Sequence, residues 1–208
     1  MSHEPLKVNY FNPQPLLIIV SGLSGVGKDT LVQALMDRRL PFYFVVTTTS
    51  RQPREGEIDG VDYFFVSQIE FQRLVNEGEM LEHAIVYGQF KGVRKTQIRE
   101  ALASGKDVIL RIDVQGVKKI RELCPDAITI FLVPTDEQEW IERLLARKSE
   151  TPESLQNRIN AAKDELNQLD LFDYVVLNAK GSLGKAVDTV EAIIIAEHHK
   201  VNPRRITL

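Results

Sequence analysis

Residues 22–30, Gly-Leu-Ser-Gly-Val-Gly-Lys-Asp-Thr, have the spacing of a phosphate-binding loop, G-x-x-x-x-G-K. Its glycines let the backbone bend so that successive amide N–H groups point at one spot. A helix that starts there adds about half a positive charge at its N-terminus, and a lysine ammonium group reaches the outer phosphates. The loop lies between an apolar run and an amphipathic segment, as the motif requires. We therefore predict a nucleotide-binding site formed by Gly22, Leu23, Ser24, Gly25, Val26, Gly27, Lys28, Asp29 and Thr30.

One residue of this loop works against phosphate binding. Asp29 stands where a hydroxyl would coordinate Mg²⁺, and Thr30 follows one residue later. A carboxylate near phosphates is repulsive unless a cation lies between them or the side chain turns away. We favour an Asp29 that accepts first-turn amides or faces solvent. A role on the metal side, direct or through water, is the alternative, and we assign no direct protein ligand to the metal.

Composition restricts the class of protein. The chain has 208 residues, 43% of them hydrophobic and 26% charged, which is typical of one globular domain. The net charge of −3 gives no general attraction to nucleic acid or to anionic membranes, so we expect neither as a partner. No apolar stretch reaches the roughly 18 residues of a membrane span. The N-terminus has no apolar core, and the chain has one cysteine, Cys124. We expect a cytoplasmic protein.

Apolar runs alternate with amphipathic segments along the chain. We predict strands at 15–20, 42–46, 63–66, 80–88, 107–114, 127–133 and 173–177. We predict helices after the phosphate loop, from 67 onwards, and at 94–105, 116–123, 135–148, 151–169 and 183–198. Strands separated by helices indicate a parallel sheet with helices on both faces.

Several finer features are expected within these helices. In the first helix, Leu31, Leu35 and Met36 point inward. Ser67 with Glu70 forms a capping box, and a Thr-x-x-Gln box starts the helix at Thr135. The helix at 151–169 begins with Thr151 at its N-cap. Residues 47–62 are polar and turn-rich, and the basic end at 200–205 either frays or contacts a neighbouring molecule.

Three further stretches identify a family. They are TTTSRQPREGEIDGVDYFFVS at 47–67, LEHA at 81–84 and IDVQG at 112–116. On these residues the chain resembles guanylate kinases over about residues 16–198. Guanylate kinases transfer the γ-phosphoryl group of ATP to GMP.

The resemblance implies a division of the chain. It implies a P-loop α/β core at 16–46 and 95–198, with a small mixed α+β GMP-binding insertion at 47–94 and a helical lid at about 143–158. An N-terminal arm at 1–15 and a tail at 199–208 flank this single domain. The resemblance also implies ATP and GMP, or dGMP, as ligands and Mg²⁺ bound with ATP. The oligomeric state is left as monomer or homodimer.

The resemblance assigns phosphate contacts to the insertion. Arg51 and Arg54 look like the pair that grips the GMP phosphate, because guanidinium planes match phosphate oxygens two at a time. Tyr63 looks like a phenol that donates to the same phosphate. Lys91 stands where the family has a phosphate-binding tyrosine, and an ammonium group also binds phosphate.

The guanine contacts are implied in the same way. Thr47 aligns with the hydroxyl that touches the guanine carbonyl. Glu82 aligns with the carboxylate that accepts from guanine N1–H and the amino group, which adenine's edge does not offer. Asp113 aligns with an acidic residue on the base and metal side.

Lid and donor residues complete the implied site. Arg143, Arg147 and Arg158 recur along one phosphate path, and Asn178 matches a position beside the adenine of ATP. The catalytic residues implied are Lys28, Arg51, Arg147 and Arg158. Positive charge and in-line placement are what phosphoryl transfer needs.

The chain also departs from the family pattern. Val93 replaces a hydroxyl that helps to hold guanine, and Arg111 replaces an acidic residue. Arg111 can grip phosphate, pair with Asp113 or Glu82, or weaken metal binding. Two alternatives to a guanylate kinase therefore stay open: a kinase for another phosphorylated acceptor, and a protein-interaction module. The presence of Lys28 and both acceptor arginines argues against the module.

Overall fold

The computed structural model describes residues 13–86, 89–145 and 152–208. Most of the predicted N-terminal arm, together with Arg147 and Thr151, lies outside the described residues. Within them, five strands form a parallel sheet in the order β2-β7-β1-β8-β9. Their bounds are β1 (Leu17–Gly22), β2 (Phe42–Phe44), β7 (Asp107–Arg111), β8 (Ile128–Val133) and β9 (Tyr174–Leu177).

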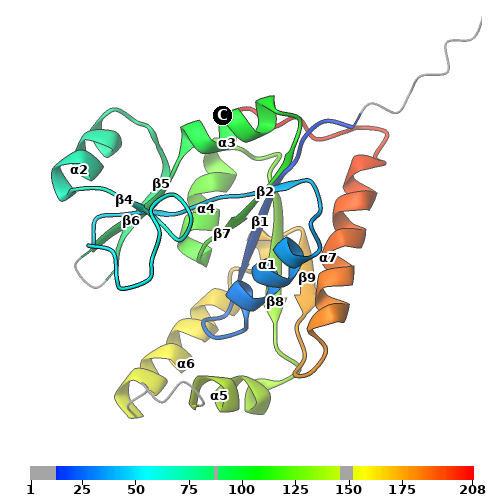
Figure 1. The fold of residues 1–208 in the computed structure, drawn as a ribbon. Helices are drawn as coiled ribbons and strands as arrows, with labels where there is room; N and C mark the ends of the chain where they lie inside the picture. The colour runs from blue at the N-terminus through cyan, green and yellow to red at the C-terminus, as the bar shows by residue number, and fades with distance from the viewer. Residues whose placement is uncertain (1–12, 87–88, 146–151) are drawn as a thin grey trace, which may run out of the picture.

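Helices cover both faces of this sheet, which confirms the predicted fold class (Figure 1). Along β1, Ile18 and Val20 pack in the cluster that holds α1 and α7, whereas Leu17 and Ile19 pack in the cluster that holds α3 and α4. An apolar run without polar alternation is therefore what a strand covered on both faces needs. The helices are α1 (Lys28–Asp37), α3 (Lys95–Ala103), α4 (Val114–Leu123), α5 (Glu137–Leu145), α6 (Pro152–Leu166) and α7 (Leu183–His198), with a 3-10 turn η1 (Leu169–Leu171).

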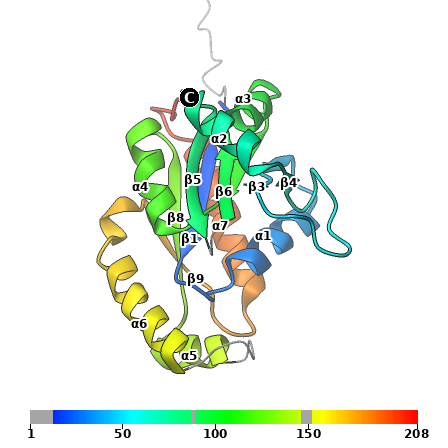
Figure 2. The ribbon, with the colours of Figure 1, turned by 90° about the vertical axis from the view of Figure 1, so that its left-hand side faces the viewer.

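A second, smaller sheet lies beside the core and has the order β4-β3-β6-β5. It is built from β3 (Thr48–Thr49), β4 (Phe64–Phe65), β5 (Met80–Val86) and β6 (Gln89–Arg94), with helix α2 (Gln68–Asn76). Phe71, Leu74 and Met80 form its own small core. In Figure 1 this unit projects to the left of the core, and α5 with α6 lie at the bottom. Figure 2 views the molecule from the left-hand side of Figure 1, with β5 and β6 towards the viewer.

Some local expectations are wrong. Met36 is 43% exposed, because it lies about 100° around the helix from Leu35, which is buried. Ser67 accepts from the Glu70 N–H, but the Glu70 carboxylate pairs with Arg73 instead of returning to Ser67.

The ends of two further elements also differ. The side chain of Asp136, not Thr135, accepts from the backbone at the start of α5, through the Glu139 N–H. The strand expected to reach residue 114 ends at Arg111, because Asp113 caps α4 by accepting from the Gly116 N–H at 2.9 Å. No helix among the described residues is long and apolar enough to span a membrane.

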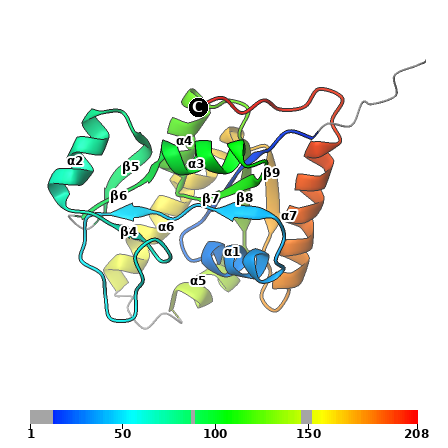
Figure 3. The same ribbon diagram turned by 45° about the horizontal axis from the view of Figure 1, so that its top comes forward.

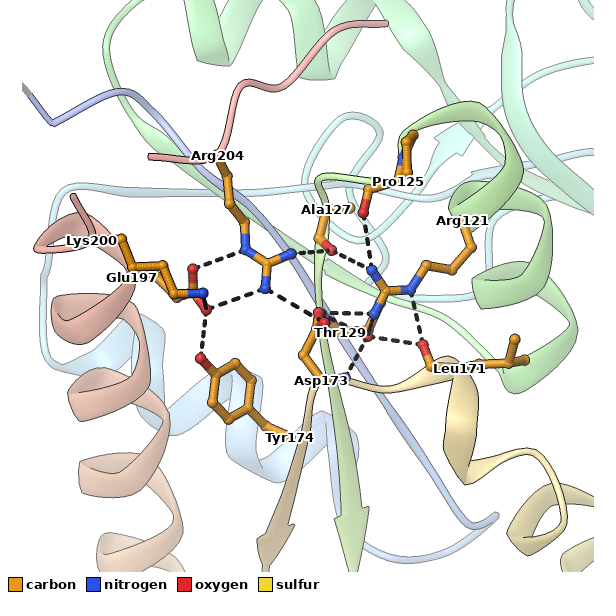
Figure 4. Close-up of polar contacts among 10 residues, drawn as sticks. All are labelled: Arg121, Pro125, Ala127, Thr129, Leu171, Asp173, Tyr174, Glu197, Lys200 and Arg204. Carbon is orange, nitrogen blue, oxygen red and sulfur yellow. Dashed lines mark hydrogen bonds and ion pairs between the residues drawn. The ribbon is translucent and has the colours of Figure 1, made fainter. Parts of the chain in front are cut away.

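The C-terminal tail is bound to the domain rather than frayed. It runs from the end of α7 across the top of the core towards α3 (Figure 3), where Ile206 and Leu208 pack in the α3/α4 cluster. Arg204 donates from Nε to Glu197 Oε2 at 2.8 Å, and the Glu197 side chain is 0% exposed. Tyr174 and Lys200 also donate to this carboxylate, at 2.5 and 2.8 Å (Figure 4).

Candidate active site

The phosphate loop has the bent backbone that its sequence predicts. Gly22 and Gly27 have φ of 139° and 99°, a region that L side chains rarely adopt. A Cβ at Gly22 would lie 2.4 Å from the Leu132 carbonyl oxygen, and one at Gly27 would lie 2.7 Å from Asn178 Nδ2. Glycine is therefore required at both positions by backbone conformation and by space.

Two side chains hold the phosphate loop through the carbonyl of Val26. Asn178 Nδ2 donates to the Val26 carbonyl at 2.9 Å, and Arg143 Nη1 donates to the same oxygen at 2.8 Å. Arg143 also donates to the Asn178 carbonyl at 2.7 Å and pairs with Glu139. Arg143 therefore helps to hold the phosphate loop in place, and its place along the phosphate path stays a prediction.

Helices α5 and α6 contact the loop at Ser24. Trp140, expected only to pack, donates from Nε1 to the Ser24 carbonyl at 2.7 Å. Arg158 Nη1 lies 2.5 Å from Ser24 Oγ, so the structure brings this predicted lid arginine to the loop. Burial raises the pKa of the nearby Glu165 carboxyl, and the Ser24 backbone N–H opposes that effect.

Sequence reasoning missed Glu165. It lies two helical turns after Arg158, so both side chains share one face of α6. The spacing of Arg158 and Glu165 was the signal in the sequence that could have identified Glu165. The contacts with Ser24 show that this face of the helix lies on the phosphate loop.

Lys28 is folded back onto the loop. Its Nζ donates to the carbonyls of Gly22 at 2.6 Å and Leu23 at 3.1 Å. Burial lowers the pKa of Lys28, while the nearby carboxylates of Glu165, Asp29 and Asp113 oppose that effect. The ammonium group of Lys28 is therefore partly buried, with carboxylates and backbone carbonyls around it.

Asp29 and Arg111 contact one another. The Arg111 guanidinium forms an ion pair with the Asp29 carboxylate, and the two side chains are 38% and 75% exposed. Arg111 thus pairs with neither Asp113 nor Glu82, which are the carboxylates considered from the sequence. Asp29 faces solvent, as favoured, but with a partner.

The insertion assembles a cationic group around Tyr63. The Arg51 guanidinium lies 4.8 Å from the centre of the Tyr63 ring, and Lys91 Nζ lies 5.7 Å from it. Glu57 binds Arg51 at two points, 2.6 and 2.5 Å, and accepts from the Arg54 backbone N–H at 2.7 Å. The arginine hydrogen bonds lower the pKa of Glu57 to about 2. Sequence reasoning named Arg51 and Arg54 but overlooked Glu57, which lies in the same motif.

The Glu82 carboxylate, which is expected to bind the base, is partly buried. Burial, with repulsion from Asp113, raises the pKa of Glu82 to about 7. Glu82 Oε2 lies 3.4 Å from the Cβ position of Gly116 at the start of α4. Val93 stands directly opposite Glu82 across β5 and β6 and is fully buried. The Thr47 carbonyl accepts from the Phe64 N–H, which places Thr47 beside β4.

The donor set suits a metal that arrives with phosphates. The described residues contain no group of three or more His, Cys, Asp or Glu side chains that could hold a metal ion. Asp29 is engaged by Arg111, and Asp113 by the Gly116 N–H. Mg²⁺ commonly keeps several waters and binds through substrate phosphates with few carboxylates. The residues present fit that mode of binding.

Comparisons with known proteins agree on one family. The guanylate kinase family profile matches residues 14–197. Guanylate kinase 2, chloroplastic/mitochondrial, of Oryza sativa subsp. japonica is 46% identical over all of this chain and 72% of its own length. The guanylate kinase of Halalkalibacterium halodurans is 43% identical over 89% of this chain and 90% of its own. A crystal structure of guanylate kinase from Anaplasma phagocytophilum superposes with a TM-score of 0.71, at 28% identity, over 92% of this chain and 90% of that one.

Proposed function

Because the chain belongs to the guanylate kinase family, we propose that it transfers the γ-phosphoryl group of ATP to GMP, yielding ADP and GDP. One observation carries the proposal: a P-loop with Lys28 at its helix start occurs in the same domain as a cationic group at Arg51, Tyr63 and Lys91. Each suits a phosphate, one on the donor and one on the acceptor.

The donor is bound by the phosphate loop. Its amides and Lys28 bind the outer phosphates of ATP, and Lys28 leaves the carbonyls of Gly22 and Leu23 to do so. A buried ammonium group stabilises the charge that develops on the transferring oxygens more than an exposed one would. Arg158, already at Ser24, adds positive charge from α6.

The acceptor is bound by the insertion. Arg51, Arg54, Tyr63 and Lys91 bind the GMP phosphate, while ionised Glu82 accepts from guanine N1–H and the amino group. An oxygen of the GMP phosphate attacks the γ-phosphorus, and the bond from that phosphorus to the β–γ bridging oxygen breaks. The acceptor phosphate is already ionised, so the step needs no general base.

The residues present would admit Mg²⁺ together with ATP in this proposal. The metal would neutralise part of the charge of the donor phosphates. Asp113 lies on this side of the site and can act through water. We place the protein in the cytoplasm, with support from its one cysteine, Cys124, which is free and buried.

A panel of acceptors tests the proposed activity. ADP release is measured with ATP and Mg²⁺ against GMP, dGMP, AMP, UMP and CMP. Saturable turnover with GMP, and little with the others except dGMP, is expected. Tight ATP binding without turnover of any of the five would point to another acceptor, which Val93 and Lys91 would then explain. Absence of ATP binding would favour an interaction module.

Matched variants separate the two halves of the site. Lys28→Ala should abolish turnover, whereas Arg51→Ala should chiefly raise the KM for GMP. Normal GMP saturation in the Arg51 variant would overturn its assignment to the acceptor phosphate.

A further inference from the structure

We propose that Arg111 is a positioning residue for nucleoside triphosphate binding, because it holds the Asp29 carboxylate away from the path of the phosphates. The inference rests on the proposed function and concerns a contact to which the proposed reaction assigns no role. It connects two unusual residues that are far apart in the sequence. One is Asp29, next to the loop lysine, and the other is Arg111, at the end of a neighbouring strand.

The contact follows from the topology. Asp29 lies in the first turn of α1, and Arg111 is the last residue of β7. β7 pairs with β1 in parallel, and Val20 stands opposite Arg111. The phosphate loop leaves the end of β1, so the end of β7 lies beside the start of α1. This brings the guanidinium to the Asp29 carboxylate.

The charges around Lys28 explain why the pairing matters. Three carboxylates act on its ammonium group, those of Glu165, Asp29 and Asp113, and Arg111 acts in the opposite direction. A triphosphate that binds there meets these negative charges as well as the lysine. Paired with Arg111, Asp29 is directed outward, with 75% of its side chain exposed, and its charge is offset.

The pair cannot be explained by its contribution to folding. Ion pairs with this exposure stabilise proteins by about 0–1 kcal/mol. Its effect on a polyanion at the same helix start is larger, because the ligand carries several charges within a few ångströms of the pair. A positioning role therefore predicts altered ATP binding with little change in the stability of the nucleotide-free protein.

A double-mutant cycle with Arg111→Met, Asp29→Asn and the double variant tests this. ATP binding is measured by calorimetry without Mg²⁺ and then with it, and KM for ATP and for GMP follow from kinetics. Arg111→Met should weaken ATP binding about tenfold, by releasing the carboxylate and removing a positive charge. Asp29→Asn should leave affinity within about twofold or tighten it, and in that background Arg111→Met should cost no more than about threefold. The KM for GMP should not change.

A similar ion pair elsewhere provides the control. Arg38 forms surface ion pairs with Asp188 at 2.6 Å and with Glu191 at 2.7 Å, and its side chain is 35% exposed. Arg38→Met should leave ATP binding unchanged, and Arg111→Met should lower the thermal stability of the nucleotide-free protein no more than Arg38→Met does.

Two results would overturn the proposal. One is an Arg111→Met variant with unaltered ATP affinity. The other is an equal loss of affinity from Arg111→Met in the unmodified chain and in the Asp29→Asn background, because Arg111 would then act on ATP by itself. If the unmodified chain binds ATP no better than Lys28→Ala does, it is the proposed function that fails.

Discussion

Arg51 and Glu57 form a two-point ion pair in the loop that precedes β4, with nitrogen–oxygen distances of 2.6 and 2.5 Å. The same carboxylate accepts from the Arg54 backbone N–H. Glu57 therefore fixes the side chain of Arg51 and the backbone at Arg54, both assigned to the GMP phosphate, before any ligand is present. Such preorganisation lowers the entropy that binding must remove from long side chains.

Removing this contact should weaken acceptor binding alone. Glu57→Gln keeps the shape of the side chain but loses the charge that orients Arg51. We expect the KM for GMP to rise about tenfold, with the KM for ATP unchanged within about twofold. Glu55→Gln, an exposed neighbour in the same loop, is the control and should alter neither constant. Equal effects of the two substitutions on GMP would show that Glu57 does not order the arginines.

Recognition of guanine should depend on pH through Glu82. Only the ionised carboxylate accepts from both guanine donors, and the pKa of Glu82 is raised to about 7. GMP affinity should therefore be high at pH 8 and fall as the pH drops through 7 and the carboxyl gains a proton. The GMP phosphate also titrates, with a pKa of about 6. Titration of the phosphate affects the Glu82→Gln variant equally, so a ratio of the two GMP affinities removes this effect.

The measurement is the ratio of GMP affinities of the unmodified protein and Glu82→Gln. This ratio should fall about tenfold between pH 8 and pH 6. A ratio that stays constant over this range would mean that Glu82 does not titrate there or does not bind the base.

Sequence patterns predicted the core sheet better than the insertion. The strands of the core are buried runs with strong local signals, as in β1. β6 (Gln89–Arg94) was missed, because Gly92 interrupts the alternation of its polar and apolar residues. Gly92 lies so close to β5 that a Cβ there would be 2.5 Å from the Glu82 carbonyl oxygen. This segment forms a strand because it pairs with β3 and β5. Local propensity carries no information about such pairing.

The same limit applies to the site. The loop glycines and the acceptor arginines carry their own motifs, so they were predictable. The Asp29–Arg111 contact depends on which strands are neighbours in the sheet, and Glu165 depends on how α6 lies over the loop. Those relationships are set by tertiary packing.

Stability should depend on the contact between the tail and α7. Arg204→Met leaves the buried Glu197 carboxylate with fewer donors, so the free energy of unfolding at pH 7 should fall by about 2 kcal/mol. Arg205→Met, next to it and exposed, should change it by less than about 0.5 kcal/mol. Urea-induced unfolding measures both. Equal stabilities of the two variants would show that the Arg204 contact does not contribute.

The contribution of Glu197 should also disappear in acid. Its pKa is lowered from an ordinary 4.5 to about 2 in the folded protein, despite burial, by hydrogen bonds led by that from Arg204. A lowered carboxyl pKa stabilises the fold fully above the unfolded value and is lost as the pH falls through the folded value. The difference between the unmodified protein and Arg204→Met should therefore narrow between pH 4.5 and pH 2. A difference that widens in this range would contradict the assignment.

The most direct test of the two-phosphate site is a crystal structure with GMP and an unreactive ATP analogue bound together. We predict the analogue's triphosphate on the loop, with Lys28 turned towards it, and the GMP phosphate on Arg51, Arg54 and Tyr63 with guanine at Glu82. GMP that is absent, or bound away from these residues while the loop is filled, would contradict the account.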